Sequence, residues 1–464
     1  MSVARTELKA LWRLAVPIIA INLGTQLMSF VDAAMVGKYS DGALRAMTLA
    51  HVWIFGTSML VMGIVLGMDP IVSQAHGARD GERVGRALQR GLVLAVLCGI
   101  PLGAAWGYTE EVLLWIYGLP FVPSSPDIAE VAALAQEYAY PQMYTAPLFL
   151  VFLAMRQYLQ GRGILAPVLY VALIANVFNA IFDWVLIRGA WGLPEYGVFG
   201  AGLATGCTRV LFPILLWVAI VRGKHHVGAW VPWTRRALHP KGLWDIGRIG
   251  FPIGIQLSLE VWAFGACTLM SEMVGEAATN AHSAVLHMAS ITFMVPMGVS
   301  FAATTRIGNL IGEGRHARAQ TTSWIAFGVG AGCMALAAAV FILGRDVLPT
   351  LILQEGSAEA LVLAASILPI AAAFQVFDGL QVVGSGILRG MGNTRPAAVI
   401  NLIGYWVIAL PLAWWLAFEQ GLGLQGVWWG LALALAIVAV GLILWVRGHG
   451  PAHMDPDHVL VESA

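Results

Sequence analysis

Four carboxylic acids lie inside long apolar stretches of this chain: Asp32, Asp183, Glu260 and Asp378. Placing a charged side chain at the centre of a bilayer costs roughly 2.5–3.5 kcal/mol on insertion scales, so such residues usually face a cavity and carry function. Desolvation disfavours the charged form of a carboxylic acid, so an intramembrane aspartate could bind and release a proton. With neighbouring amide oxygens it could instead bind a hard cation such as Na⁺. These residues indicate ion-coupled transport.

Each acid continues a polar stripe along its helix. The polar residues recur mostly at steps of three or four, which places them on one helix face. The stripes are Asn22, Gln26, Ser29 and Asp32; Asn176, Asn179 and Asp183; Gln256 and Glu260; and Gln375, Asp378, Gln381 and Ser385. Lipid cannot satisfy these groups, so the stripes must face one another or a wet cavity. The candidates for lining a substrate cavity are Gln26, Ser29, Gln256, Gln375 and Gln381.

The composition predicts an all-α integral membrane protein. The chain has 464 residues, of which 59% are hydrophobic and only 11% charged, whereas soluble domains carry about 25% charged residues. Its apolar runs are continuous rather than alternating, which argues against a β-barrel. We expect about 12 transmembrane helices. Their predicted ranges are 12–37, 46–72, 86–117, 128–155, 162–188, 197–222, 241–273, 279–308, 316–346, 357–386, 393–418 and 423–447.

The connecting segments alternate between basic and acidic or uncharged. The longest basic one follows residue 222 and carries Lys224, Arg235 and Arg236. The positive-inside rule places the basic links in the cytoplasm, and an even number of spans then leaves both termini there too. We therefore expect a multi-pass protein of a cell inner membrane.

The chain also repeats itself. A shift of 235 residues superimposes Pro17 on Pro252, Gly77 on Gly312 and Arg83 on Arg318 without a gap. Transporters are often built from such repeats. The predicted domains are an N-terminal six-helix lobe at 1–222, a cytoplasmic basic linker at 223–240, a C-terminal six-helix lobe at 241–447 and a cytoplasmic tail at 448–464. The acids do not repeat, because Asp32 falls on Cys267, so each lobe is expected to have its own acid pair.

Sequence signals for a metal site, nucleotide binding or catalysis are weak. The four cysteines are scattered singly without metal-ligand spacing. No phosphate-binding loop follows a strand, and no nucleophile–base arrangement is evident, so we expect neither an ATP-driven pump nor an enzyme. Cofactors and nucleic acid are not expected as partners, and we expect a monomer in the lipid bilayer. Pro17 lies in the middle of the first helix and is a candidate hinge.

Taken together, the motifs resemble the multidrug and toxic compound extrusion (MATE) transporters, most closely the NorM-type branch. The resemblance covers about residues 8–447. It rests on five segments in order: VPIIAINLGTQLMSFVDAAMVG, QAHGARD, NVFNAIFDWVLI, SLEVW and FDGLQVVGSGILRGMGNTRP. It implies two six-helix lobes around a V-shaped cavity, and export of organic cations and drugs against inflow of Na⁺ or H⁺. The acid in SLEVW, Glu260, favours the NorM-type branch over one that lacks it.

The resemblance also implies roles for individual residues. Asp32 resembles the coupling acid of the N-terminal lobe, and its partners by motif are Asn176, Asn179, Asp183 and Thr205. Glu260 and Asp378 resemble the cation site of the C-terminal lobe, with Na⁺ as a possible ligand. The sequence leaves open the coupling ion, its stoichiometry, the substrate, and which lobe binds the drug. The alternative function is a flippase for lipids or lipid-linked saccharides, whose anionic substrates would require a basic cavity.

Overall fold

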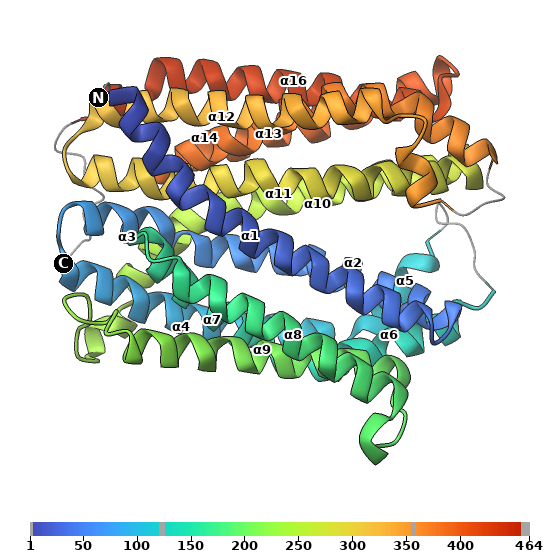
Figure 1. Cartoon of the computed structure of the whole chain (residues 1–464), viewed down its shortest axis with the longest axis horizontal. Coiled ribbons are helices and arrows are strands. Elements are labelled where there is room, and N and C mark those ends of the chain that lie inside the picture. The colour runs from blue at the N-terminus through green and yellow to red at the C-terminus, as the bar shows by residue number, and fades with distance from the viewer. Residues whose placement is uncertain (1–2, 120–125, 354–357, 456–464) are drawn as a thin grey trace. The chain divides into compact units, whose positions relative to one another are not determined.

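The computed structural model describes residues 3–119, 126–353 and 358–455, and within these ranges all regular secondary structure is helical (Figure 1). The α-helices are α1 (Val3–Gly37), α2 (Asp41–Leu66), α3 (Met68–Gly77), α4 (Gly81–Trp106), α5 (Thr109–Tyr117), α6 (Ile128–Met143), α7 (Ala146–Gly161), α8 (Ala166–Arg188), α9 (Gly197–Arg222), α10 (Pro240–Val274), α11 (Glu276–Gly312), α12 (His316–Leu343), α13 (Ala358–Met391), α14 (Arg395–Asn401), α15 (Leu410–Trp414) and α16 (Gly423–His449). Two π-helical segments, Leu402–Ala409 and Trp415–Glu419, flank α15.

The all-helical membrane fold predicted from composition is confirmed. Eleven helical stretches among the described residues are long and apolar enough to cross a bilayer. The remaining predicted span, 128–155, forms two helices of 16 residues each, α6 and α7, instead of one long helix. They are separated at Tyr144 and Thr145, and Pro147 lies in the first turn of α7, where its fixed backbone angle and missing N–H are tolerated. The first helix begins at Val3 rather than at residue 12.

The helices form two compact units, neither of which is continuous in sequence. Among the described residues, the first unit comprises residues 3–19, Asp69–Arg79 and the residues from Ile255 onward, and the second comprises Ala20–Met68 and Asp80–Gly254. The units therefore change inside α1, just after Pro17, and inside α10, just after Pro252. The predicted lobe, linker and tail boundaries stay a prediction, and residues 456–464 of the tail lie outside the described residues.

In the first unit, α11, α12, α13 and α16 pack side by side (Figure 1). Phe374, Tyr405 and Trp428 fill its core. The repeat is visible in one contact between α3 and α11: Gly77 lies against the Asn309 carbonyl, and Gly312 lies against the Gln74 carbonyl. These two contacts are related by the same 235-residue shift. Neither glycine has room for a Cβ, which explains why the repeat preserves both.

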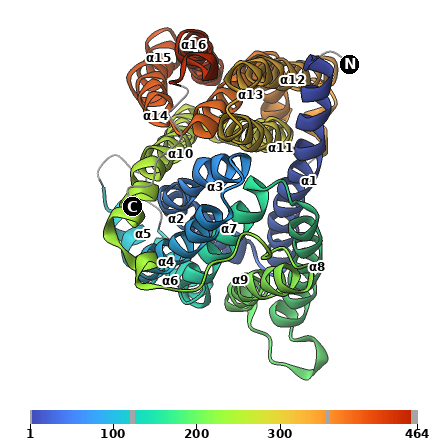
Figure 2. The same cartoon turned by 90° about the vertical axis from the view of Figure 1, so that its left-hand side faces the viewer.

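In the second unit, α4 packs on α7, and α9 packs on α6, α7 and α8 (Figure 2). Close approach again depends on glycine: Gly63 of α2 lies directly against the backbone of Gly254 in α10. Small residues at such positions let membrane helices approach closely, because lipid supplies no hydrophobic force to drive them together. The second unit also contains α8 and the part of α1 from Ala20 onward, which carry the first acid pair.

Candidate functional site

The second unit brings two predicted acids together. Asp32 of α1 is 6% exposed and Asp183 of α8 is fully buried, and their carboxyl groups are hydrogen-bonded to each other. A carboxylate is an acceptor only, so a hydrogen bond between two carboxyl groups requires a proton on one of them. This pair therefore has the chemistry of a site that holds one proton between two acids.

The other predicted members of this set lie close by. Asn176 of α8 approaches Gly24 of α1 so closely that a Cβ at Gly24 would lie 2.9 Å from its Nδ2. Asn179, one turn before Asp183, is fully buried. Thr205 of α9 donates to the Ala201 carbonyl at 3.1 Å, which is an ordinary contact within its own helix.

Sequence reasoning missed Tyr138 of α6. Its side chain is hydrogen-bonded to Thr205 and is electrostatically coupled to both Asp32 and Asp183. Thr205 therefore belongs to the same polar cluster through Tyr138. A buried tyrosine needs a hydrogen-bond partner, but nothing in the local sequence distinguishes this one from a packing aromatic.

The first unit contains the second acid pair, Glu260 of α10 and Asp378 of α13, and the two are electrostatically coupled. The Gln381 amide donates to Oε2 of Glu260 at 3.4 Å and to Oδ1 of Asn401 at 2.8 Å. Asn401 is itself fixed by its bond to the Ala397 carbonyl. Here one acid, Glu260, is held by an amide side chain.

This second pair is surrounded by unsatisfied polar atoms. Among the described residues, Oδ1 of Asp378, Oε1 of Gln381 and the Tyr405 hydroxyl are buried without a hydrogen-bond partner. Buried polar atoms are rarely left unpaired. Oxygen atoms are the ligands that hard cations prefer, so these atoms and the two acids fit a small cation such as Na⁺. No three His, Cys, Asp or Glu side chains converge in the described part of the chain.

The predicted cavity residues divide into two kinds. Three of the glutamines join helices. The Gln256 amide donates to the Ser385 hydroxyl at 2.9 Å, and Oε1 of Gln375 accepts from Thr292 at 2.8 Å. Gln381, described above, joins α13 to α10 and α14. Gln26 and Ser29 are partly exposed on α1. A role in lining a substrate cavity stays a prediction for all five residues.

Two of the helices also contain an arginine in contact with aromatic rings, and one of these, Arg389, is buried, so the buried charge is not exclusively acidic. In the second unit, the Arg209 guanidinium lies 5.0 Å from the Trp106 ring centre and 5.2 Å from that of Phe149. In the first unit, Arg389 of α13 is buried, and its guanidinium lies 5.2 Å from the ring centre of Phe301. Both make cation–π contacts, which contribute most when desolvated.

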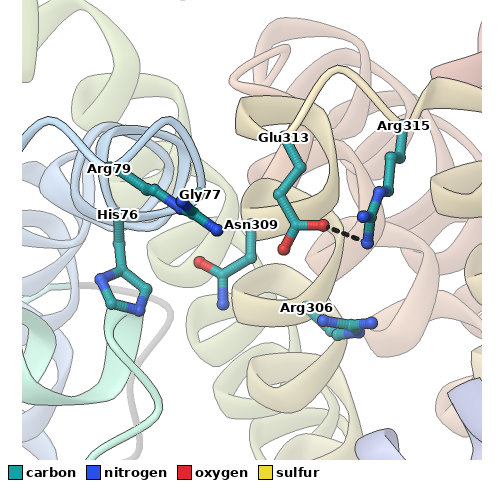
Figure 3. A pocket seen from close by; sticks show the side chains of 7 residues that line it. All are labelled: His76, Gly77, Arg79, Arg306, Asn309, Glu313 and Arg315. Atoms are coloured by element: carbon teal, nitrogen blue, oxygen red, sulfur yellow. Dashed lines mark ion pairs between the residues drawn. The ribbon is translucent and has the colours of Figure 1, made fainter.

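A cavity of about 600 Å³ lies in the first unit between α3 and the end of α11 (Figure 3). Its lining is mostly basic: His76, Gly77, Arg79, Arg306, Asn309, Glu313 and Arg315. Arg315 is paired with Glu313 at 2.8 Å. None of the predicted site residues lines it, so this cavity is separate from both acid pairs.

Comparison with known proteins accounts for the fold and the repeat together. The MatE family model matches residues 17–185 and again residues 252–415, and these two matches begin 235 residues apart. The chain is 34% identical over 445 residues to the probable multidrug resistance protein NorM of Bradyrhizobium diazoefficiens, covering 94% of this chain and 92% of that one. It is 35% identical over 437 residues to the probable multidrug resistance protein NorM of Burkholderia pseudomallei, covering 93% and 91%.

Solved structures of MATE transporters share the fold of this chain. The crystal structure of the eukaryotic MATE transporter AtDTX14 matches with a TM-score of 0.88 at 23% identity, covering 97% of this chain and 98% of that one. An outward-facing multidrug resistance MATE family transporter of the MOP superfamily matches with a TM-score of 0.85 at 20% identity, covering 96% of both. At these identities the likeness concerns the fold. With the family model and the NorM relatives, it shows that this chain belongs to the MatE family of membrane transporters.

Proposed function

We propose that this protein exports drugs and other organic cations from the cell by antiport with H⁺ or Na⁺, through alternating access. Its relatives named multidrug resistance proteins support the substrate class. Anionic groups attract cationic compounds, and aromatic side chains bind cations through the ring face. In this proposal the protein lies in an inner membrane with both termini in the cytoplasm.

The observation that carries the proposal is the presence of two different buried acid pairs. Asp32 and Asp183 share a hydrogen bond that requires one proton. Around Glu260 and Asp378, several buried oxygen atoms have no hydrogen-bond partner in the described part of the chain. The first arrangement suits proton exchange and the second suits a cation. Alternating access follows if the coupling ion and the drug bind the two states of the transporter with different affinities.

The test is efflux of ethidium from proteoliposomes under a Na⁺ gradient and a pH gradient imposed separately. Ethidium efflux under the pH gradient alone would assign ion coupling to Asp32 and Asp183. Ethidium efflux under the Na⁺ gradient alone would assign ion coupling to Glu260 and Asp378. Transport under neither gradient would refute the proposal.

The arginines within the helices, Arg209 and Arg389, support one second candidate, a flippase for lipid-linked or other anionic substrates. One solved structure with the same fold, from Pyrococcus furiosus, is described as having a binding pocket of reverse polarity that suggests a different function. Arg209 has a buried nitrogen without a hydrogen-bond partner among the described residues. Movement of a fluorescent lipid phosphate, but not of ethidium, in the same liposomes would favour this candidate.

A further inference from the structure

The first unit contains a buried acid that neither acid pair uses. Glu7, in the second turn of α1, is fully buried. Its carboxylate accepts two hydrogen bonds from Arg306 of α11, at 2.7 and 2.9 Å. It also pairs with Arg318 of α12 and accepts from the Thr322 hydroxyl at 3.3 Å. A two-pronged arginine–carboxylate contact fixes geometry as well as charge.

This cluster fastens one end of a helix that belongs to both units. Residues of α1 up to Ile19 belong to the first unit, and those from Ala20 onward belong to the second. Glu7 therefore holds the beginning of α1 against α11 and α12, while the same helix carries Asp32 in the second unit. Pro17, which removes a backbone hydrogen bond, lies between Glu7 and Asp32, just before the change from the first unit to the second.

The repeat lacks this contact in the other half of the chain. The position equivalent to Glu7 is Gly242 of α10, and the positions equivalent to Arg306 and Thr322 are Ile71 and Ala87. Only Arg318 has a basic counterpart, Arg83. Gly242 lies instead against the guanidinium of Arg90. Because the packing of the halves is repeated but this ion cluster is not, the cluster is not a requirement of the shared fold.

We propose that Glu7 is a positioning residue for transport: it fixes the beginning of α1 to α11 and α12, so that ion exchange at Asp32 moves the rest of α1 against a fixed point. This inference rests on the proposed function. Without the anchor, a change at Asp32 shifts the whole helix instead, and the gradient is dissipated without export.

The experiment compares four purified full-length proteins in liposomes. Glu7→Gln removes the charge and keeps the shape. Glu82→Gln is the matched control, because Glu82 pairs with Arg86 on an exposed helix surface, where an ion pair contributes little. The third variant combines Glu7→Leu, Arg306→Met and Arg318→Met. Apolar residues of similar volume can replace a buried ion cluster without loss of stability, so this variant restores the anchor without its charges.

Hydrogen exchange is measured for residues 3–16, and ethidium efflux is measured per amount of gradient dissipated. We expect Glu7→Gln to speed exchange in this segment by at least about tenfold and to lower coupled efflux while the gradient leaks. The control and the apolar variant should match the wild type in both. If Glu7→Gln does not fold, the apolar variant alone still tests whether an uncharged anchor supports coupled efflux.

Unchanged exchange in Glu7→Gln would show that Glu7 is no anchor. Fast exchange with wild-type coupling, or an apolar variant that is anchored but uncoupled, would overturn the positioning role. Failure of the wild type to move ethidium would refute the proposed function, and with it the role in transport, whereas the exchange measurement would still decide whether Glu7 anchors α1.

Discussion

The two acid pairs occupy different units of one repeated fold and differ in how their oxygen atoms are satisfied. Asp32 and Asp183 bond directly to each other, with Tyr138 and Thr205 beside them. The Gln381 amide donates to Glu260, whereas Oδ1 of Asp378 is buried without a hydrogen-bond partner among the described residues. In the first pair the two acids can share one proton. For the second pair we expect the open oxygen atoms to bind a cation.

This difference shows how a duplicated scaffold can carry two chemistries. The backbone packing repeats with the 235-residue shift, as the glycine contacts of α3 and α11 demonstrate. The acids do not repeat, so each unit could change its side chains without disturbing the helix contacts. Transport coupled to a proton at one pair and to a cation at the other is then compatible with one set of helix movements.

The largest effect is expected from Asp32→Asn. The amide can still donate to Asp183, so this variant resembles the protonated pair but cannot release a proton. We expect it to fold and insert, and ethidium efflux driven by a pH gradient should fall to the level of empty liposomes. Export at the wild-type rate, with equal amounts of protein in the bilayer, would defeat the coupling role of Asp32.

The second largest effect is expected from Asp378→Asn, which removes one of the two charges at the other pair. The affinity for Na⁺ should fall by more than about tenfold, because the charge count of the ligands sets the affinity for hard cations. The measurement is the Na⁺ concentration that half-saturates efflux. Asp346→Asn is the control, since Asp346 is exposed and its contact with Arg345 is 3.7 Å long. An equal Na⁺ response in both variants would remove the distinction between the pairs.

Sequence patterns predicted the helical fold well, for a physical reason. Apolar runs and polar stripes are local features, and a buried carboxylate stands out in any membrane helix. The stripes containing Asp32 and Asp183 therefore pointed to faces that the structure brings together. The 235-residue shift is also readable, because glycines that permit close contacts, such as Gly77 and Gly312, cannot be replaced freely.

The rest of each site depends on contacts between distant segments. Tyr138 and Tyr405 lie in helices without a polar stripe, and only the folded structure shows that they reach an acid pair. Arg209 was missed because its aromatic neighbours resemble ordinary packing residues. The division of the predicted 128–155 span into α6 and α7 was also not predicted, although Pro147 marks it.

A smaller effect is expected from Tyr138→Phe, which tests whether the first pair extends through Thr205. Loss of one hydrogen bond beside the acids should cost about 1 kcal/mol, equivalent to a roughly fivefold slower efflux under a pH gradient. The Na⁺ response should not change, because Tyr138 belongs to the second unit. A change in the Na⁺ response instead would show that the two pairs are not independent.

The smallest effect is expected from Tyr405→Phe. The sign of the change in Tm distinguishes the alternatives for this variant. A buried hydroxyl without a partner destabilises the folded state, so its removal should leave Tm unchanged or raise it slightly in Na⁺-free buffer. If the hydroxyl is a cation ligand, the same change should reduce the increase in Tm that Na⁺ produces, since a ligand stabilises only the state that binds it. A lower Tm without Na⁺ would mean that the hydroxyl is already satisfied, and the second pair would then resemble the first.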